Sequence, residues 1–282
     1  MSQTQSFSRA RKLAESAIMV TIATVLYILK LMELPYGGAV TIASMLPVII
    51  ISYRHGIRWG LLTGFVFGVL QQLLGLQTLS YVTTWQSILA VILLDYLIAF
   101  MCTGFGGVFK EKMSQPNALG FGALLVCVLR YLCHVISGAT VWAGLSIPTN
   151  AALIYSLGYN ATYMIPETIV TTALAFAIGS TLDFRSDRIR HLQPKNRRES
   201  NKEYLLKLGG ILALAIALVF DVRFVFAGLQ NAETGDFDIT GLAAVNWTAV
   251  AVVSLICIVT AIVLFVIAYR IKKREKTDQP GE

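Results

Sequence analysis

Apolar segments long enough to cross a membrane as helices recur along most of the chain. A helix needs about 20 mostly apolar residues for this, because each residue rises about 1.5 Å through a hydrocarbon layer of about 30 Å. We therefore expect an all-α fold, a polytopic bundle of membrane helices, with both termini in the cytoplasm. Eight segments approach this length: 13–33, 39–53, 59–74, 85–109, 118–142, 164–182, 204–229 and 247–271.

The composition agrees with a membrane solvent. Apolar residues make up 56% of the 282 residues and charged residues only 14%, and the mean hydropathy is +0.67. Soluble domains usually carry about a quarter charged residues, so a soluble globule, a disordered chain and a coiled coil are excluded. The net charge of +7 lies in short runs between apolar segments, whereas a nucleic-acid-binding protein gathers its charge on one soluble face.

The basic residues alternate between the connections. The N-terminal arm, the second, fourth and sixth connections and the tail are basic, and the odd-numbered connections carry no Lys or Arg. Cytoplasmic connections carry the excess of Lys and Arg in membrane proteins. The pattern predicts a multi-pass membrane protein with both termini cytoplasmic. The basic residues in question include Arg9, Arg11, Arg54, Arg58, Lys110, Lys112, Arg185, Arg198, Arg270 and Lys272.

Three regions follow from these segments. Residues 1–182 form a six-span core, residues 183–203 a basic cytoplasmic linker, and residues 204–282 a two-span hairpin with a basic tail. The hairpin spans are almost purely aliphatic, and we expect Asp221 to pair with Arg223. Glycines 56, 60, 64 and 68 share one helix face, which favours close packing of helices.

Sequence motifs for enzymes are missing. The chain contains no GxxxxGK[ST] phosphate loop, GxSxG or HExxH motif, so we expect neither ATP hydrolysis nor another enzymatic activity. The four cysteines fall inside predicted spans and form no CxxC pair, which predicts no structural disulfide, no metal site and no cofactor.

A few ionisable residues lie within the predicted core spans. Each costs about 2.5–3.5 kcal/mol near the middle of a membrane helix and therefore needs a reason. Asp95 lies in the fourth span, Arg130 and His134 in the fifth, and Glu167 near the start of the sixth. Arg130, His134, Gly138 and Trp142 recur every four residues and share a face. Asn160, Met164 and Glu167 also share a face if the sixth helix begins that early.

These side chains allow more than one interpretation. Asp95 and Arg130 could simply neutralise each other, His134 could be an ordinary core histidine, and Trp142 could belong to an interfacial aromatic belt. Taken together, an acid, an amide, an imidazole and aromatic rings favour a small, flat, polar heteroaromatic ligand that enters from outside. An acid facing aromatic rings would suit a cationic ligand.

The sequence resembles the thiamine-specific S components, the substrate-binding subunits of energy-coupling-factor (ECF) vitamin transporters. The resemblance spans about residues 10–185, on the six core spans that this family also has. The segments that carry it are Pro35-Tyr-Gly-Gly38, Met45 to Gly56, Leu94-Asp95-Tyr96, Arg130-Tyr-Leu-Cys-His134 with Gly138 and Trp142, and Tyr155 to Asn160.

The resemblance implies a thiamine-binding site at matching positions. These are Asp95, Tyr96, Arg130, His134, Gly138, Trp142, Tyr155 and Asn160. A tryptophan that some members carry falls on Gly38, which removes one stacking wall. The third connection is longer than in short members, and Tyr81 or Trp85 could supply an aromatic ring there. Glu167 is a further candidate.

The resemblance also implies partners. S components dock on a membrane coupling (T) subunit through small residues of the first helix, which here are Ala17 and Thr21. Two cytoplasmic ATPase subunits would supply the energy. We expect uptake of thiamine, and keep a thiamine precursor such as hydroxymethylpyrimidine, or another flat vitamin, as the alternative ligand. A membrane enzyme and a purely structural subunit are weaker alternatives.

Overall fold

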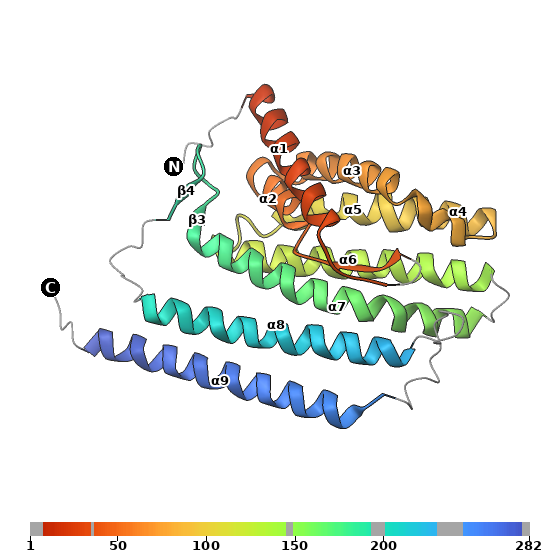
Figure 1. The fold of residues 1–282 in the computed structure, drawn as a ribbon. Helices are drawn as coiled ribbons and strands as arrows, with labels where there is room; N and C mark the ends of the chain where they lie inside the picture. The colour runs from red at the N-terminus through yellow and green to blue at the C-terminus, as the bar shows by residue number, and fades with distance from the viewer. Residues whose placement is uncertain (1–7, 35–36, 145–148, 193–200, 230–244, 278–282) are drawn as a thin grey trace. The chain divides into compact units, whose positions relative to one another are not determined.

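The computed structural model describes residues 8–34, 37–144, 149–192, 201–229 and 245–277 (Figure 1). The chain forms two compact units, residues 1–192 and 193–282. In the described residues, five helices are long and apolar enough to cross a membrane. They are Ile57–Leu74, Trp85–Gly107, Gln115–Val141, Asn150–Thr181 and Trp247–Ile271.

The first unit is a helical bundle with two small hairpins. Its elements are α1 (Arg9–Ile28), β1 (Lys30–Glu33), β2 (Ala39–Thr41), α2 (Leu46–His55), α3 (Ile57–Leu74), η2 (Leu76–Tyr81), α4 (Trp85–Ala90), η3 (Val91–Ile98), α5 (Ala99–Met101), η4 (Cys102–Gly107), α6 (Gln115–Gly144), α7 (Thr149–Thr181), β3 (Leu182–Asp183) and β4 (Arg190–His191). The long helices α6 and α7 lie side by side (Figure 1). The segments α2, η3 and η4 pack against α6.

Glycines bring the helices of this bundle into close contact. A methyl group on Gly64 would lie 2.5 Å from the carbonyl oxygen of Phe100, and one on Gly68 would lie 2.8 Å from that of Tyr96. Gly60 packs equally closely on Ser52 of α2. The predicted packing face on α3 is therefore present from Gly60 onward, while Gly56 is a turn residue with a φ of 94°.

Three features differ from the expected helices. The predicted first span ends in β1, which pairs antiparallel with β2, so a hairpin replaces the end of one span and the start of the next. The second helix has only 10 residues. Helix α7 begins at Thr149 rather than near residue 164. Residues 150–163 are only weakly apolar, so hydropathy did not predict this part of the helix, which packs against α6.

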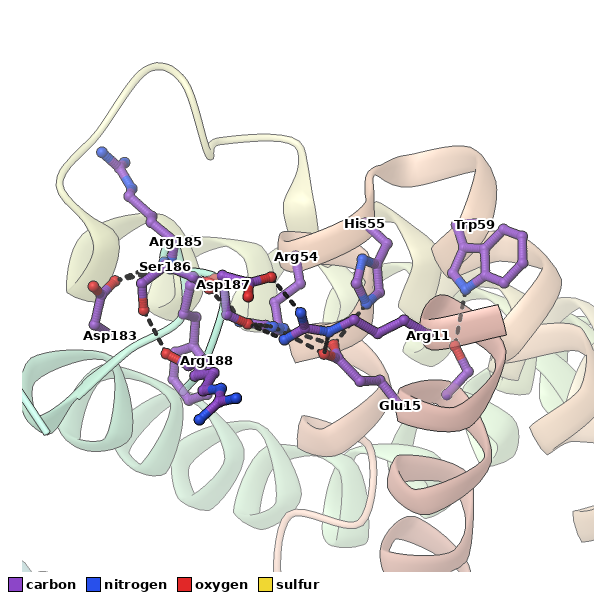
Figure 2. A network of polar contacts seen from close by, with 12 residues as sticks. Arg11, Glu15, Arg54, His55, Trp59, Asp183, Arg185, Ser186, Asp187 and Arg188 are labelled. Carbon is purple, nitrogen blue, oxygen red and sulfur yellow. Dashed lines mark hydrogen bonds and ion pairs between the residues drawn. The ribbon is translucent and has the colours of Figure 1, made fainter. Parts of the chain in front are cut away.

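A polar cluster fastens one end of the first unit (Figure 2). Glu15 of α1 accepts hydrogen bonds from Arg11 (3.0 Å), from Arg54 (3.0 and 3.1 Å) and from His55 (2.8 Å). Arg54 also donates to the carbonyl oxygens of Phe184, Ser186 and Asp187 at 2.9–3.2 Å. The cluster joins α1, the end of α2 and the segment after α7.

Residues from the basic connections meet at this end. Lys110 donates to the carbonyl oxygen of Arg54 at 3.3 Å, and Arg185 donates to that of Lys110 at 2.8 Å. Burial lowers the pKa of His55, although its contact with Glu15 partly offsets this. The alternating charge pattern thus corresponds to one face on which the N-terminal arm and the second, fourth and sixth connections come together.

The second unit contains the helices α8 (Asn201–Leu229) and α9 (Trp247–Thr277), which pack against each other. Asp221 of α8 accepts a hydrogen bond from the hydroxyl of Ser254 at 2.6 Å. The expected partner Arg223 is exposed instead. A serine one helix away satisfies the carboxylate better than a neighbour two positions along, since residues i and i+2 do not face each other on a helix.

Candidate functional site

A cavity lies between η3, α6, α7 and the β1–β2 hairpin, at residues far from the cluster around Glu15. It combines one acid, one guanidinium, an imidazole, an amide and five tyrosines, which is a mixed polar and aromatic lining. Its lining residues are Tyr27, Gly37, Gly38, Ala39, Thr78, Tyr81, Val82, Val91, Asp95, Tyr96, Phe100, Arg130, His134, Gly138, Val141, Tyr159, Asn160 and Tyr163.

The segment η3 places two consecutive residues on the cavity. Asp95 and Tyr96 both line it. They belong to a π-helix, residues Val91–Ile98, and such segments often occur at functional sites. The hydroxyl of Tyr96 lies 3.1 Å from that of Thr78, which also lines the cavity.

Asp95 is linked to two residues of α6. One carboxylate oxygen lies 2.7 Å from Nδ1 of His134, and the other accepts a hydrogen bond of 2.8 Å from Ser137. About a quarter of the Asp95 side chain stays accessible, so it can also meet a ligand. Asp95 therefore pairs with His134 and not with Arg130, which answers one alternative left open by the sequence.

Arg130 is buried, and its guanidinium contacts an aromatic ring and a thioether sulfur. Its guanidinium carbon lies 4.4 Å from the ring centroid of Phe100, and it contacts the sulfur of Met45. Its Nη2 lies 3.4 Å from Nε2 of His134. With a proton on Nδ1 facing Asp95, Nε2 is the acceptor that this contact needs. Among the described residues, Nε of Arg130 has no hydrogen-bond partner.

Helix α7 contributes an amide and two phenol rings. The side-chain amide of Asn160 donates to the backbone oxygens of His134 and Ser156, and its oxygen accepts from the hydroxyl of Tyr163. The bond to His134 joins α7 to α6 next to Gly138, where a methyl group would lie 2.4 Å from Oγ of Ser156. Gly138 is thus needed for the close approach of the two helices.

Other predicted residues lie beside the cavity or outside it. Glu167 does not line it but accepts hydrogen bonds from the backbone N–H of Thr41 (2.6 Å) and from its hydroxyl (2.7 Å), which anchors β2. Tyr155 does not line the cavity either. Trp85 is 70% exposed, and Tyr81 is the aromatic residue of the third connection that lines the cavity. The Trp142 side chain lies outside the described part of α6.

Several lining residues were not predicted from the sequence. Tyr27 comes from the end of α1, Phe100 from α5, and Tyr159 and Tyr163 from α7. Tyr159 and Tyr163 lie four apart, on the same face as Asn160, and this spacing is the signal that could have found them. The spacing of Tyr159 and Tyr163 indicates a shared face only if the helix includes residue 159, and the predicted span began at residue 164.

A bundle of membrane helices around a cavity lined by charged, amide and aromatic side chains defines an integral membrane protein that binds a small ligand. The comparisons with known proteins make this specific. The family described as "Thiamine transporter protein" matches residues 13–184, which is more than half of the chain.

Relatives agree with this family. The thiamine transporter ThiT of Bacillus subtilis (strain 168) is 35% identical over 171 residues, covering 56% of this chain and 85% of the relative. ThiT of Lacticaseibacillus paracasei is 26% identical over 169 residues, covering 55% and 78%. The solved structure of ThiT from Listeria monocytogenes covers 61% of this chain and 94% of that one, with a TM-score of 0.50 and 20% identity, and it supports the fold.

The chain belongs to the thiamine transporter family. It is a multi-pass membrane protein of a transport family and not an enzyme, as the sequence predicted. The matched residues lie within the first unit, so α8 and α9 stand outside the family match.

Proposed function

We propose that the cavity of the first unit binds thiamine from outside the cell and that Asp95 is its main polar anchor. The observation that carries this is the accessible carboxylate of Asp95, held by His134 and Ser137 in a cavity rich in aromatic rings. A carboxylate of this kind can accept hydrogen bonds from an aminopyrimidine or balance the charge of a thiazolium ring. The family match supports the choice of ligand.

The other predicted residues take separate roles in this proposal. Arg130 offers a guanidinium N–H that has no hydrogen-bond partner among the residues the structure describes, Tyr96 and Gly138 shape the cavity, and Asn160 holds α6 and α7 together. Trp142 stacks on the ligand. Tyr155 lies on α7 outside the lining, and Glu167 supports the site through β2. Trp85 plays no part.

We infer that the protein works as the S component of an ECF transporter. A T subunit docks on the exposed small residues Ala17 and Thr21 of α1, and two cytoplasmic ATPase subunits supply the energy. Small exposed residues allow close helix–helix approach in the membrane. The basic residues around Arg54 support a cytoplasmic location for this end of the first unit, and we infer that both termini are cytoplasmic and that the cavity opens to the outside.

The test is ligand binding by the purified protein in detergent, measured by calorimetry. We expect saturable thiamine binding, with Asp95→Asn weakening it by about 10- to 100-fold, the scale of a charge-assisted hydrogen bond. Trp142→Ala should weaken it further, and Trp85→Ala is the matched control that should not.

Competition by the separate pyrimidine and thiazolium halves distinguishes thiamine from a pyrimidine precursor. Full binding by the Asp95→Asn, Trp142→Ala double variant would refute the site.

A further inference from the structure

Gly38 and two tyrosines of α7 share one small space at the cavity. A methyl group on Gly38 would lie 2.8 Å from Cδ1 of Tyr163 and 2.9 Å from the hydroxyl oxygen of Tyr159. The backbone N–H of Gly38 donates to that hydroxyl at 3.1 Å. The two rings can occupy this position only because residue 38 has no side chain, since any Cβ would displace both.

The two rings are held in place by the protein. The hydroxyl of Tyr163 donates to the amide oxygen of Asn160, and its ring lies edge-to-face with those of His134 and Tyr159, at centroid distances of 6.0 and 5.8 Å. Both tyrosines are 7% exposed and both line the cavity. Because their hydroxyls are engaged, the side chains offer a ligand their π systems.

The charged residues around the cavity do not by themselves favour a cationic ligand. Asp95 is already shared between His134 and Ser137, and Arg130 brings a positive charge into the same lining. Among the described lining residues, a cationic ligand therefore meets one carboxylate, which already has two protein partners, and a guanidinium that repels it. Electron-rich ring faces attract a cation without adding a formal charge.

We propose that Tyr159 and Tyr163, packed into the space beside Gly38, form an aromatic wall that contacts the cationic ring of the ligand and sets the preference for a charged over a neutral ring. This proposal rests on the proposed function, because it takes the thiazolium of thiamine as that ring. Arg130, which is stacked on Phe100, then faces the uncharged parts of the ligand.

The experiment compares two ligands on the full-length protein in detergent. One is thiamine, and the other is its neutral thiophene analogue, in which carbon replaces the charged ring nitrogen. For Tyr163→Leu we expect thiamine affinity to fall about 10-fold, the scale of a desolvated cation–π contact, and analogue affinity to fall several-fold less. Tyr163→Phe keeps the ring and should stay within about 3-fold of the wild type for both ligands.

Tyr131 supplies the matched control. It lies on α6, donates to the backbone oxygen of Leu157 and does not line the cavity, so Tyr131→Leu should leave both affinities unchanged. Thermal unfolding establishes that each variant is folded. Tyr159→Leu provides the same two-ligand comparison if Tyr163→Leu does not fold, and Gly38→Ala should weaken both ligands by displacing the rings.

The outcomes separate this proposal from the proposed function. If the wild type binds thiamine and both leucine variants bind it as well as the wild type, the aromatic wall is refuted. Equal losses for thiamine and for the neutral analogue would also refute it, because a loss of shape alone would then explain the data. If the wild-type protein binds no thiamine, the proposed function itself fails.

Discussion

At the scale of single residues, the polar side chains of the membrane segments are arranged in two ways. Asp95, His134 and Ser137 bond to one another and still face the cavity. Glu167 is 3% exposed, and both of its carboxylate oxygens accept hydrogen bonds from Thr41. An ionisable group within the membrane is expensive unless it is paired, so each pairing has a role: the first forms the site and the second anchors the hairpin beside it.

Glu167→Leu should destabilise the protein. Leucine removes both acceptor oxygens, so the buried backbone N–H of Thr41 loses its carboxylate partner at a cost of about 1–3 kcal/mol. We expect a lower thermal midpoint in detergent, and weaker thiamine binding because β2 carries Ala39 into the lining. Ser180→Ala, which removes an exposed hydroxyl bonded to Phe176 within α7, is the control. Equal midpoints for the two variants would contradict this role of Glu167.

The predicted site residues differ in how they could be found. Arg130, His134 and Gly138 follow from an i, i+4 repeat on one helix, and all three line the cavity. Asp95 was found because an acid in an apolar span needs a reason. Tyr159 and Tyr163 were missed because their face exists only once α7 extends back to Thr149. No sequence pattern indicates the π-helix that contains Asp95 and Tyr96, two residues that line the cavity.

At the scale of elements, the bundle depends on close approach between α3 and the segment from η3 to η4. The predicted glycine spacing identified the face of α3, and the structure adds its partner: the backbone near Phe100 and Tyr96. The short α2 and the β1–β2 hairpin could not be predicted from hydropathy alone, because both lie within apolar segments. In the hairpin, β2 is held by the bond from Thr41 to Glu167, two residues that are distant in the sequence.

Gly64→Ala should cost about 1–3 kcal/mol of stability, the usual range for overpacking. The added methyl group would lie 2.5 Å from both the Phe100 carbonyl and Oγ1 of Thr103, which forces the two segments apart. Gly158→Ala is the matched control on α7, because no atom lies within 4 Å of its added methyl group, and alanine favours a helix by up to about 1 kcal/mol. Thermal unfolding in detergent should show opposite shifts for the two variants, and a shift of the same sign would count against the packing argument.

Glu15→Gln should loosen the cluster that joins α1 to α2 and to the segment after α7. Arg54 is 1% exposed at its side chain and would lose its ion pair with Glu15, and breaking a buried ion pair costs about 3–5 kcal/mol. Arg11→Gln removes a partner that is one-third exposed, for which about 0–1 kcal/mol is expected. Denaturation in detergent should therefore rank Glu15→Gln well below Arg11→Gln, and a reversed order would show that Glu15 is dispensable.

At the scale of the whole molecule, the two units have different relations to the proposed function. The family match ends at residue 184 and the first unit ends at residue 192. All residues that line the cavity belong to the first unit. The second unit, with α8 and α9, is joined by polar sequence that includes Arg197 and Arg198. Its described polar contacts, between Asp221 and Ser254 and between Lys207 and Glu203, are internal.

A protein truncated after residue 192 should therefore still bind thiamine. The cavity, the β1–β2 hairpin and the cluster around Glu15 are all made by residues before this point, so we expect an affinity within about 3-fold of the full chain, a difference of less than 1 kcal/mol. Calorimetry on both proteins in the same detergent measures this, and Asp95→Asn in the truncated protein should reproduce the loss seen in the full chain. A truncated protein that is folded yet binds no thiamine would show that α8 and α9 take part in the site.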